Sequence, residues 1–166
     1  MKKFLATAGT IALLALTSAP AIAATPTTQA TATAKIYTPL SISRVRDLDF
    51  GVIVLNNTTF ASETVSLSLA SSVTCGGGVN MTCSGSPQTA RYNLVGSNNA
   101  DVTVTSPGFN LTGPGTLAFT PTSTSFTVNI GGTGTKDFDI GGSIPVAGAT
   151  PEGVYTGNFL VTANYK

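Results

Sequence analysis

The sequence predicts an all-β protein, a two-sheet β-sandwich that follows a cleaved N-terminal leader. Three observations predict it. A basic head and an apolar run open the chain. Short stretches of alternating apolar and polar residues then recur, separated by Gly and Pro. No stretch after the leader has the three-to-four-residue periodicity of a helix, so about eight or nine strands are expected to form two packed sheets.

The first 23 residues have the composition of a secretory signal peptide. Lys2 and Lys3 precede a mostly apolar run over 4–19, and the small residues Ala-Ile-Ala end at Ala23. The run is too short and too interrupted by Thr for a membrane-spanning helix. Cleavage between Ala23 and Ala24 would leave 143 of the 166 residues, enough for one domain. The signal peptide predicts export through the inner membrane. No later stretch is long and apolar enough to span a membrane, so the mature protein is expected to be soluble or held at a surface by partners.

The charges that remain after cleavage argue against several functions. Without Lys2 and Lys3, six cations face seven carboxylates, which gives no attraction for nucleic acid or an anionic membrane. The chain has no His, so the usual Ser–His–Asp and Cys–His arrangements cannot form. The sequence therefore predicts a protein that is not an enzyme and uses no cofactor.

Cys75 and Cys83 are the only cysteines, and they lie in one short Gly-rich segment. In an exported chain such a pair is expected to form a disulfide. A zinc site would need two further ligands that the sequence does not offer.

Two pairs of aspartates, Asp47 with Asp49 and Asp137 with Asp139, each fall on one strand face. Such a pair could contribute to a Ca²⁺ site, but hard cations take six or more oxygen ligands. Solvated polar faces are therefore the favoured interpretation, and no metal site is predicted.

The segment 24–37 begins with a low-complexity stretch, 24–35, and over 30–37 apolar side chains alternate with Thr, Lys and Tyr. The apolar positions are Ala30, Ala32, Ala34 and Ile36. The segment is either an extended arm that pairs with the edge of another sheet or the first strand of the domain itself. Pro39 ends the alternation, because proline cannot donate a backbone hydrogen bond.

The sandwich domain is expected over 38–166. A hairpin is predicted around the Gly-Pro-Gly turn between 109–111 and 117–119. The other predicted strands are 48–55, 64–70, 90–96, 101–105, 125–130, 136–146 and 154–165.

The last predicted strand reaches almost to the final residue. Its apolar residues occupy every second position, which predicts a strand with one buried face. These inward residues are Phe159, Val161, Ala163 and Tyr165, with Leu160, Thr162 and Asn164 pointing the other way. Most chains end in a polar, frayed tail, so this ending raises the question of what covers the strand.

The C-terminal pattern resembles that of chaperone–usher pilus subunits. These typically carry a glycine fourteenth from the end, alternating apolar residues and a penultimate aromatic, as Gly153 and Tyr165 do here. The segment DLDFGVI (47–53) is similar to the LxFG segment of spore-coat-U-type archaic pilins. The overall layout most closely resembles a family of exported bacterial domains of unknown function that are themselves pilin-like.

The resemblance implies an immunoglobulin-like sandwich that lacks its last strand. The groove left by that strand would be covered first by a periplasmic chaperone and then, at an outer-membrane usher, by the arm of the next subunit. The resemblance would place Gly153, Phe159, Val161, Ala163 and Tyr165 at the groove. It would place Ala30, Ala32, Ala34 and Ile36 on the donor arm.

On this interpretation the protein passes through the periplasm and is assembled at the cell surface as a fimbrial homopolymer, or with sibling subunits. The alternative is a self-complete secreted sandwich that binds a surface ligand such as a glycan. The two hypotheses differ in whether the last strand has a neighbour on both sides.

Overall fold

The computed structural model describes residues 25–166, so the predicted signal peptide and the cleavage site between Ala23 and Ala24 lie outside the described residues. By its contacts, the chain divides into a part that ends at Lys35 and a part that spans Ile36–Lys166. Residues 25–35 are exposed and contain no strand. Within 25–40 the structure has no strand, so the domain's first strand lies after Pro39 rather than within 30–37.

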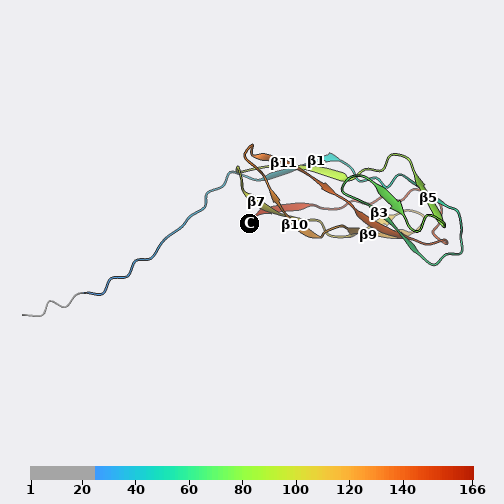
Figure 1. Cartoon of the computed structure of the whole chain (residues 1–166), viewed down its shortest axis with the longest axis horizontal. Coiled ribbons are helices and arrows are strands. Elements are labelled where there is room, and N and C mark those ends of the chain that lie inside the picture. Colours follow the sequence, from blue (N-terminus) through green and yellow to red (C-terminus); the bar gives the residue numbers. More distant parts are fainter. Residues whose placement is uncertain (1–24) are drawn as a thin grey trace, which may run out of the picture. The chain divides into compact units, whose positions relative to one another are not determined.

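The described residues form strands and no helix, which confirms the predicted all-β fold (Figure 1). The strands are β1 (Ser41–Arg46), β2 (Val52–Leu55), β3 (Glu63–Leu67), β4 (Val73–Cys75), β5 (Met81–Ser84), β6 (Ala90–Val95), β7 (Asp101–Thr105), β8 (Phe109–Thr112), β9 (Thr116–Pro121), β10 (Ser125–Asn129), β11 (Thr135–Ile140), β12 (Gly142–Val146) and β13 (Thr162–Tyr165).

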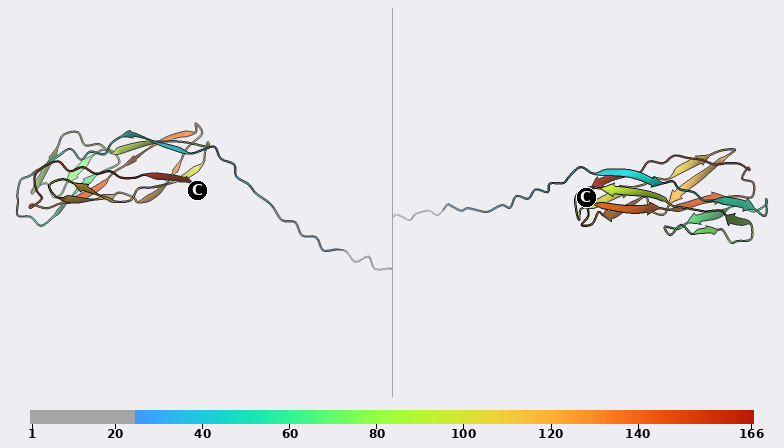
Figure 2. Two further views of the ribbon diagram at one scale, coloured as in Figure 1. Left: turned by 180° about the vertical axis from the view of Figure 1, so that it is seen from behind. Right: turned by 90° about the horizontal axis from the view of Figure 1, so that it is seen from above.

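Several of these strands are interrupted halves of longer ones. β1 and β2 run antiparallel to β6 and β5 with nearly constant register, and a bridge between Asp49 and Gln88 joins the two halves. β7 and β8 likewise run against β10 and β9, with the predicted Gly113-Pro114-Gly115 turn between β8 and β9. The described residues form 13 strands where eight or nine were predicted, because several long strands are interrupted. Figure 2 shows the strands from two further sides.

The predicted strand over 136–146 is divided because the chain changes partners in the middle. β11 pairs with β6, whereas β12 pairs with β3 and β9. Gly142 stands at this change, and a Cβ there would lie 2.4 Å from the Thr120 carbonyl oxygen. Only glycine allows that approach without a shift of the backbone.

Inward-facing apolar side chains form two neighbouring core clusters. One is built from β3, β9 and β12 and includes Val65, Leu67, Phe119 and Ile144. The other is built from β6, β7, β10 and β11 and includes Leu94, Val102, Val104, Ile130 and Phe138. Half-buried Leu48 packs against both clusters, so the two halves of the sandwich share one continuous interior.

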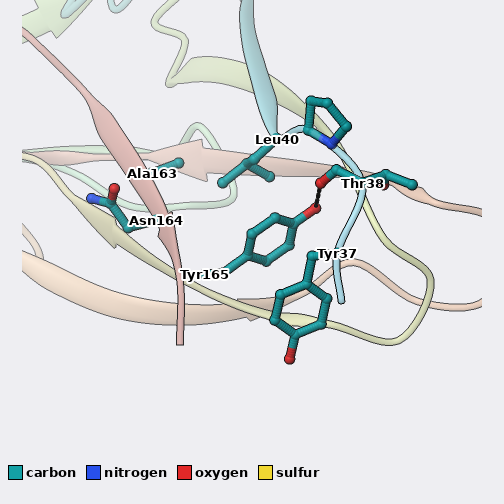
Figure 3. Close-up of a pocket in the computed structure, with 7 residues that line it drawn as sticks. Tyr37, Thr38, Leu40, Ala163, Asn164 and Tyr165 are labelled. Atoms are coloured by element: carbon teal, nitrogen blue, oxygen red, sulfur yellow. Dashed lines mark hydrogen bonds between the residues drawn. The ribbon is translucent and has the colours of Figure 1, made fainter. Parts of the chain in front are cut away.

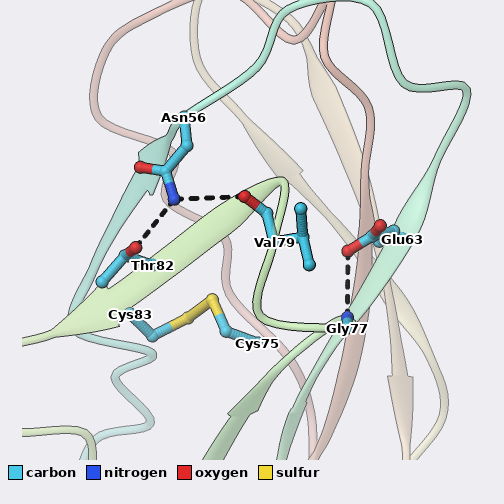
Figure 4. The surroundings of a disulfide bond; sticks show 7 residues. All are labelled: Asn56, Glu63, Cys75, Gly77, Val79, Thr82 and Cys83. Atoms are coloured by element: carbon cyan, nitrogen blue, oxygen red, sulfur yellow. Dashed lines mark hydrogen bonds between the residues drawn. A yellow bond between two sulfur atoms is a disulfide. The ribbon is translucent and has the colours of Figure 1, made fainter.

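The predicted disulfide between Cys75 and Cys83 is present, with a Cα–Cα distance of 5.8 Å (Figure 4). It links β4, at the edge of one sheet, to β5 in the neighbouring β2–β5 pair. The loop between them is held by Glu63, whose carboxylate accepts a hydrogen bond of 3.1 Å from the Gly77 N–H. The bridge therefore closes one side of the sandwich.

Over residues 25–166 no helix is long and apolar enough to cross a membrane.

Candidate functional site: the open edge of the sandwich

The final strand is shorter than predicted. β13 pairs with β7, and upstream Thr156 exchanges two backbone hydrogen bonds, of 2.7 and 2.9 Å, with Thr112. Between these two anchor points, the backbone of 157–161 forms no hydrogen bond with another backbone group of residues 25–166. The predicted strand 154–165 is therefore an extended segment that is paired only near its two ends.

Pro107 interrupts the ladder beside the unpaired stretch. The Lys166 N–H donates to the Asp101 carbonyl at 3.0 Å, so alternation along the antiparallel ladder directs the backbone groups of Thr103 and Thr105 toward β13 as well. The next position in that alternation is Pro107, which has no N–H to donate. The register beyond it is shifted by one residue, as the Thr112–Thr156 pair shows.

The side chains of the final segment alternate as predicted between the interior and solvent. Four half-buried residues pack against the core cluster of β6, β7, β10 and β11: Phe159, Val161, Ala163 and Tyr165. Leu160 is 72% exposed, and Thr162 and Asn164 are also exposed. Gly153 lies apart from them: its φ is +143°, and a Cβ there would lie 2.5 Å from Pro114. It serves the turn that leads into the final segment.

Phe159 holds the unpaired stretch to the core through aromatic contacts. Its ring stacks on Phe109 with centroids 4.7 Å apart and an interplanar angle of 8°. It also contacts Phe119 at 6.1 Å and Tyr92 at 6.4 Å. Because these partners belong to both core clusters, Phe159 joins the two halves of the interior.

The first and last strands are both edge strands, and they lie close to each other. β1 is the edge of the sheet β1–β6–β11, and β13 is the edge of the sheet β10–β7–β13. The two approach one another directly, yet no pairing joins them. Alternation along the ladder directs the backbone N–H and C=O groups of Ala163 and Tyr165 away from β7, so the described strands leave them unpaired.

Apolar side chains line this region from both sheets. Leu40, Ile42 and Leu48 come from the β1 side, are half-buried, and pack against the same cluster as the residues of the final segment. We refer to β1 together with 156–165 as the open edge.

One end of the open edge is closed by Tyr165 (Figure 3). Its hydroxyl donates a hydrogen bond of 2.9 Å to the Thr38 carbonyl and accepts one of 2.8 Å from the Ser97 N–H. The ring of Tyr37 stacks on the ring of Tyr165 with centroids 4.4 Å apart. A surface hollow of about 500 Å³ lies beside these residues and is also lined by Leu40 and Ala163.

The roles of Tyr37, Thr38 and Ser97 were not predicted from the sequence. Tyr37 is the last residue of the predicted arm and Thr38 the first of the predicted domain, and Ser97 lies 59 positions from Thr38. The alternation in 30–36 gave no signal of these contacts, because they are made by a turn between β6 and β7.

The four aspartates considered as metal ligands are separated by the fold. Asp47 pairs with Arg44, and the Asp49 carboxylate accepts the Gly51 N–H at 2.8 Å. Asp137 accepts a hydrogen bond from Asn93. No group of three or more His, Cys, Asp or Glu side chains gathers as metal ligands within 25–166.

Asp139 belongs to an ion-pair cluster. Arg91 donates to both of its carboxylate oxygens, at 3.0 and 2.8 Å, and Arg46 approaches it at 3.2 Å. The hydrogen bond from Arg91 is the main cause that lowers the pKa of this carboxyl, against the opposing effect of burial. The Thr89 hydroxyl and the charge of Arg46 lower the pKa further. The cluster ties the end of β1 to β6 and β11.

The fold and the open edge define an all-β sandwich whose first and last strands face each other without pairing. Residues 40–165 match the family described as a domain of unknown function (DUF4402), and the chain belongs to that family. No curated protein and no solved structure matches the chain.

Proposed function

We propose that this protein is an exported structural subunit of a cell-surface fimbria or pilus-like assembly, and that its open edge receives an extended strand from another subunit. One observation carries the proposal: β1 and the segment 156–165 are neighbouring edge strands with apolar side chains between them and no strand that pairs with both. The role is structural and requires no catalytic group.

The open edge offers what strand addition needs. An added strand gains affinity from main-chain hydrogen bonds and its register from alternate side chains. The outward backbone groups of Ala163 and Tyr165, and the unpaired backbone of 157–161, supply hydrogen-bonding positions. Apolar side chains from both sheets would receive the inward residues of the added strand. Burial of such an edge also removes the aggregation risk that an unpaired strand carries.

The N-terminal arm of another copy has the length and composition of the added strand. Between Pro26 and Pro39, every residue can donate a backbone hydrogen bond. This stretch of 12 residues exceeds the ten residues of 156–165, which span about 33 Å when extended. Residues 25–38 are exposed and carry no strand. Those before Thr38, whose backbone groups bond with Ser97 and Tyr165, remain available for pairing.

The inward side chains of the arm would be Ala30, Ala32, Ala34 and Ile36. Three of them bury only a methyl group, and each methylene that is absent forgoes about 0.8 kcal/mol of hydrophobic stabilisation. Since the large side chains of Phe159 and Tyr165 already pack against the core cluster at this edge, small inward residues on the arm are compatible with it. On this proposal, main-chain hydrogen bonds contribute more to assembly than side-chain burial does.

The resemblance to chaperone–usher pilins suggests how such an edge is protected during export. A periplasmic chaperone would cover the open edge, and an outer-membrane usher would exchange it for the arm of the next subunit. The disulfide and the predicted signal peptide are consistent with a route through an oxidising compartment. The final location would be the cell surface.

The test compares polymer formation by the mature chain (24–166), a chain that lacks 24–35, and the variant Ala32→Pro. Proline in the middle of the arm removes a donor and disrupts pairing. Since Ala32 is exposed and outside any strand, its replacement should leave the melting temperature of the monomer unchanged. Thr31→Ala is the matched control, because it keeps the backbone donor.

We expect size-exclusion chromatography with light scattering to show polymers for the mature chain and for Thr31→Ala. The deleted chain and Ala32→Pro should remain monomeric. A mature chain that stays monomeric at high concentration, and melts well above its arm-deleted form, would show that the arm completes its own domain. That result would favour the self-complete, ligand-binding alternative.

A further inference from the structure

We infer that Tyr165, Ser97 and Thr38 form a latch that keeps the arm of a chain out of that chain's own open edge, which leaves the edge free for another copy. This inference rests on the proposed function, because it concerns which arm occupies the edge. The latch consists of the hydrogen bonds that join these three residues where the arm meets the domain. Figure 3 shows the one between Tyr165 and Thr38.

Both backbone polar groups of Thr38 are engaged in the latch. Its N–H donates to the Ser97 side-chain oxygen at 2.7 Å, and its carbonyl accepts from the Tyr165 hydroxyl at 2.9 Å. The Ser97 N–H in turn donates to the Tyr165 oxygen at 2.8 Å. The root of the arm is therefore fixed to the C-terminal strand and to the turn between β6 and β7.

A chain that filled its own edge would have to reverse direction at the latch. β1 begins at Ser41, so the arm could lie beside β1 only through a hairpin over 37–40. Short hairpin turns are closed by main-chain hydrogen bonds, but those of Thr38 are already used. Pro39 offers no N–H and favours an extended Thr38. Self-insertion would therefore require the latch to open.

The two tyrosine rings add to this effect. Tyr37 stacks on Tyr165 at the end of the open edge, where a reversed arm would have to enter. Gly96 permits the arrangement, since a Cβ at this position would lie 2.4 Å from the Tyr165 hydroxyl oxygen.

Such a device matters because self-insertion has a concentration advantage. An arm attached directly to its own domain acts at an effective concentration of about millimolar or more, whatever the protein concentration. An arm from another chain competes at the actual subunit concentration. Polymerisation then requires a structural feature that makes self-insertion of the arm less favourable. The latch is that feature.

The test is amide hydrogen exchange at Ala30, Ala32 and Ala34 in the mature chain, measured in dilute monomer and in polymer. Tyr165→Phe removes the hydroxyl and keeps the ring, and Ser97→Ala removes the acceptor for Thr38. Tyr155→Phe is the matched control, because the Tyr155 hydroxyl also donates to a backbone carbonyl, that of Pro151, at 2.8 Å. Circular dichroism establishes that each variant is folded, and Ser97→Ala keeps the test available if Tyr165→Phe does not fold.

We expect the arm amides of the wild type and Tyr155→Phe to be protected only in the polymer. In Tyr165→Phe and Ser97→Ala, they should become protected in the monomer too. The ratio of self-inserted to free monomer should rise by a factor of about 5 to 30, the effect of losing one or two ordinary interactions.

Three other results overturn different statements. Protection in the polymer, with variant monomers that exchange as fast as the wild type, would refute the latch and leave the proposed function intact. Protection in the wild-type monomer would also refute the latch. Arm amides that are unprotected in both monomer and polymer would refute the proposed function itself.

Discussion

Phe159→Ala is expected to destabilise the domain strongly, although the residue lies in a stretch that forms no strand. The backbone of 157–161 has no backbone partner among the described residues, so side-chain packing alone holds this stretch to the core. Phe159 provides most of that packing through Phe109, Phe119 and Tyr92.

The magnitude follows from two contributions. Burial of a large apolar side chain stabilises by about 1.5 to 3 kcal/mol, and a half-buried ring belongs at the lower end of that range. Well-oriented aromatic pairs add about 0.5 to 1.5 kcal/mol each, of which the stacked pair with Phe109 has the best geometry. We therefore expect Phe159→Ala to lower the free energy of unfolding by about 3 kcal/mol.

Urea unfolding followed by far-ultraviolet circular dichroism measures this loss, with the disulfide kept intact. Leu160→Ala is the control next in sequence: its side chain is 72% exposed, so it should change stability by no more than about 0.5 kcal/mol. Phe159→Leu should fall between the two, since it keeps apolar volume and loses the aromatic pairing. If Phe159→Ala were tolerated as well as Leu160→Ala, the segment would not be held as described.

Two further predictions concern the disulfide and the ion-pair cluster. Replacing both Cys75 and Cys83 by Ser should lower the free energy of unfolding by about 2.5 kcal/mol in the chain-entropy estimate for so short a loop; alkylatable thiols in protein recovered from the periplasm would contradict the bridge. Asp139→Asn should destabilise the fold at neutral pH, because it removes the carboxylate that Arg91 and Arg46 share. The pKa of Asp139 is lowered in the folded state, so its contribution is complete above about pH 5 and is lost as pH falls below about 4. The difference in stability between wild type and variant should therefore shrink on acidification, and a difference that grew instead would contradict the assignment.

Alternation in the sequence was sufficient to predict the fold class and most strands. Where one face is buried, the side-chain period of two is imposed by the pleat, so Val102 with Val104 and Phe126 with Val128 mark strands without further information. The same rule gave the inward set of the final segment. The disulfide could also be predicted from the sequence, because Cys75 and Cys83 had no other possible partners.

Features that depend on the partner of a strand could not be predicted in this way. The ladder breaks beside 157–161 near Pro107, which lies between β7 and β8, and its place opposite the segment follows only from the register. β1 was missed as a separate strand because half-buried Ile42 and Arg46 are flanked by exposed residues, so its alternation is weak. The contact between Thr38 and Ser97 likewise depends on the position of the turn after β6 relative to the end of the arm.

The connectivity explains why one side of this sandwich is open. On the opposite side, β10 and β11 belong to different sheets, yet a loop of a few residues joins them, and the disulfide joins β4 to β5. At the open edge, β1 and β13 come from the two ends of the domain, so no loop can join them. Contacts between chain ends also carry the greatest loop-closure entropy. A sandwich with this strand order is stabilised least where its first and last strands meet. A strand from another chain would therefore stabilise it most if it were added between β1 and β13.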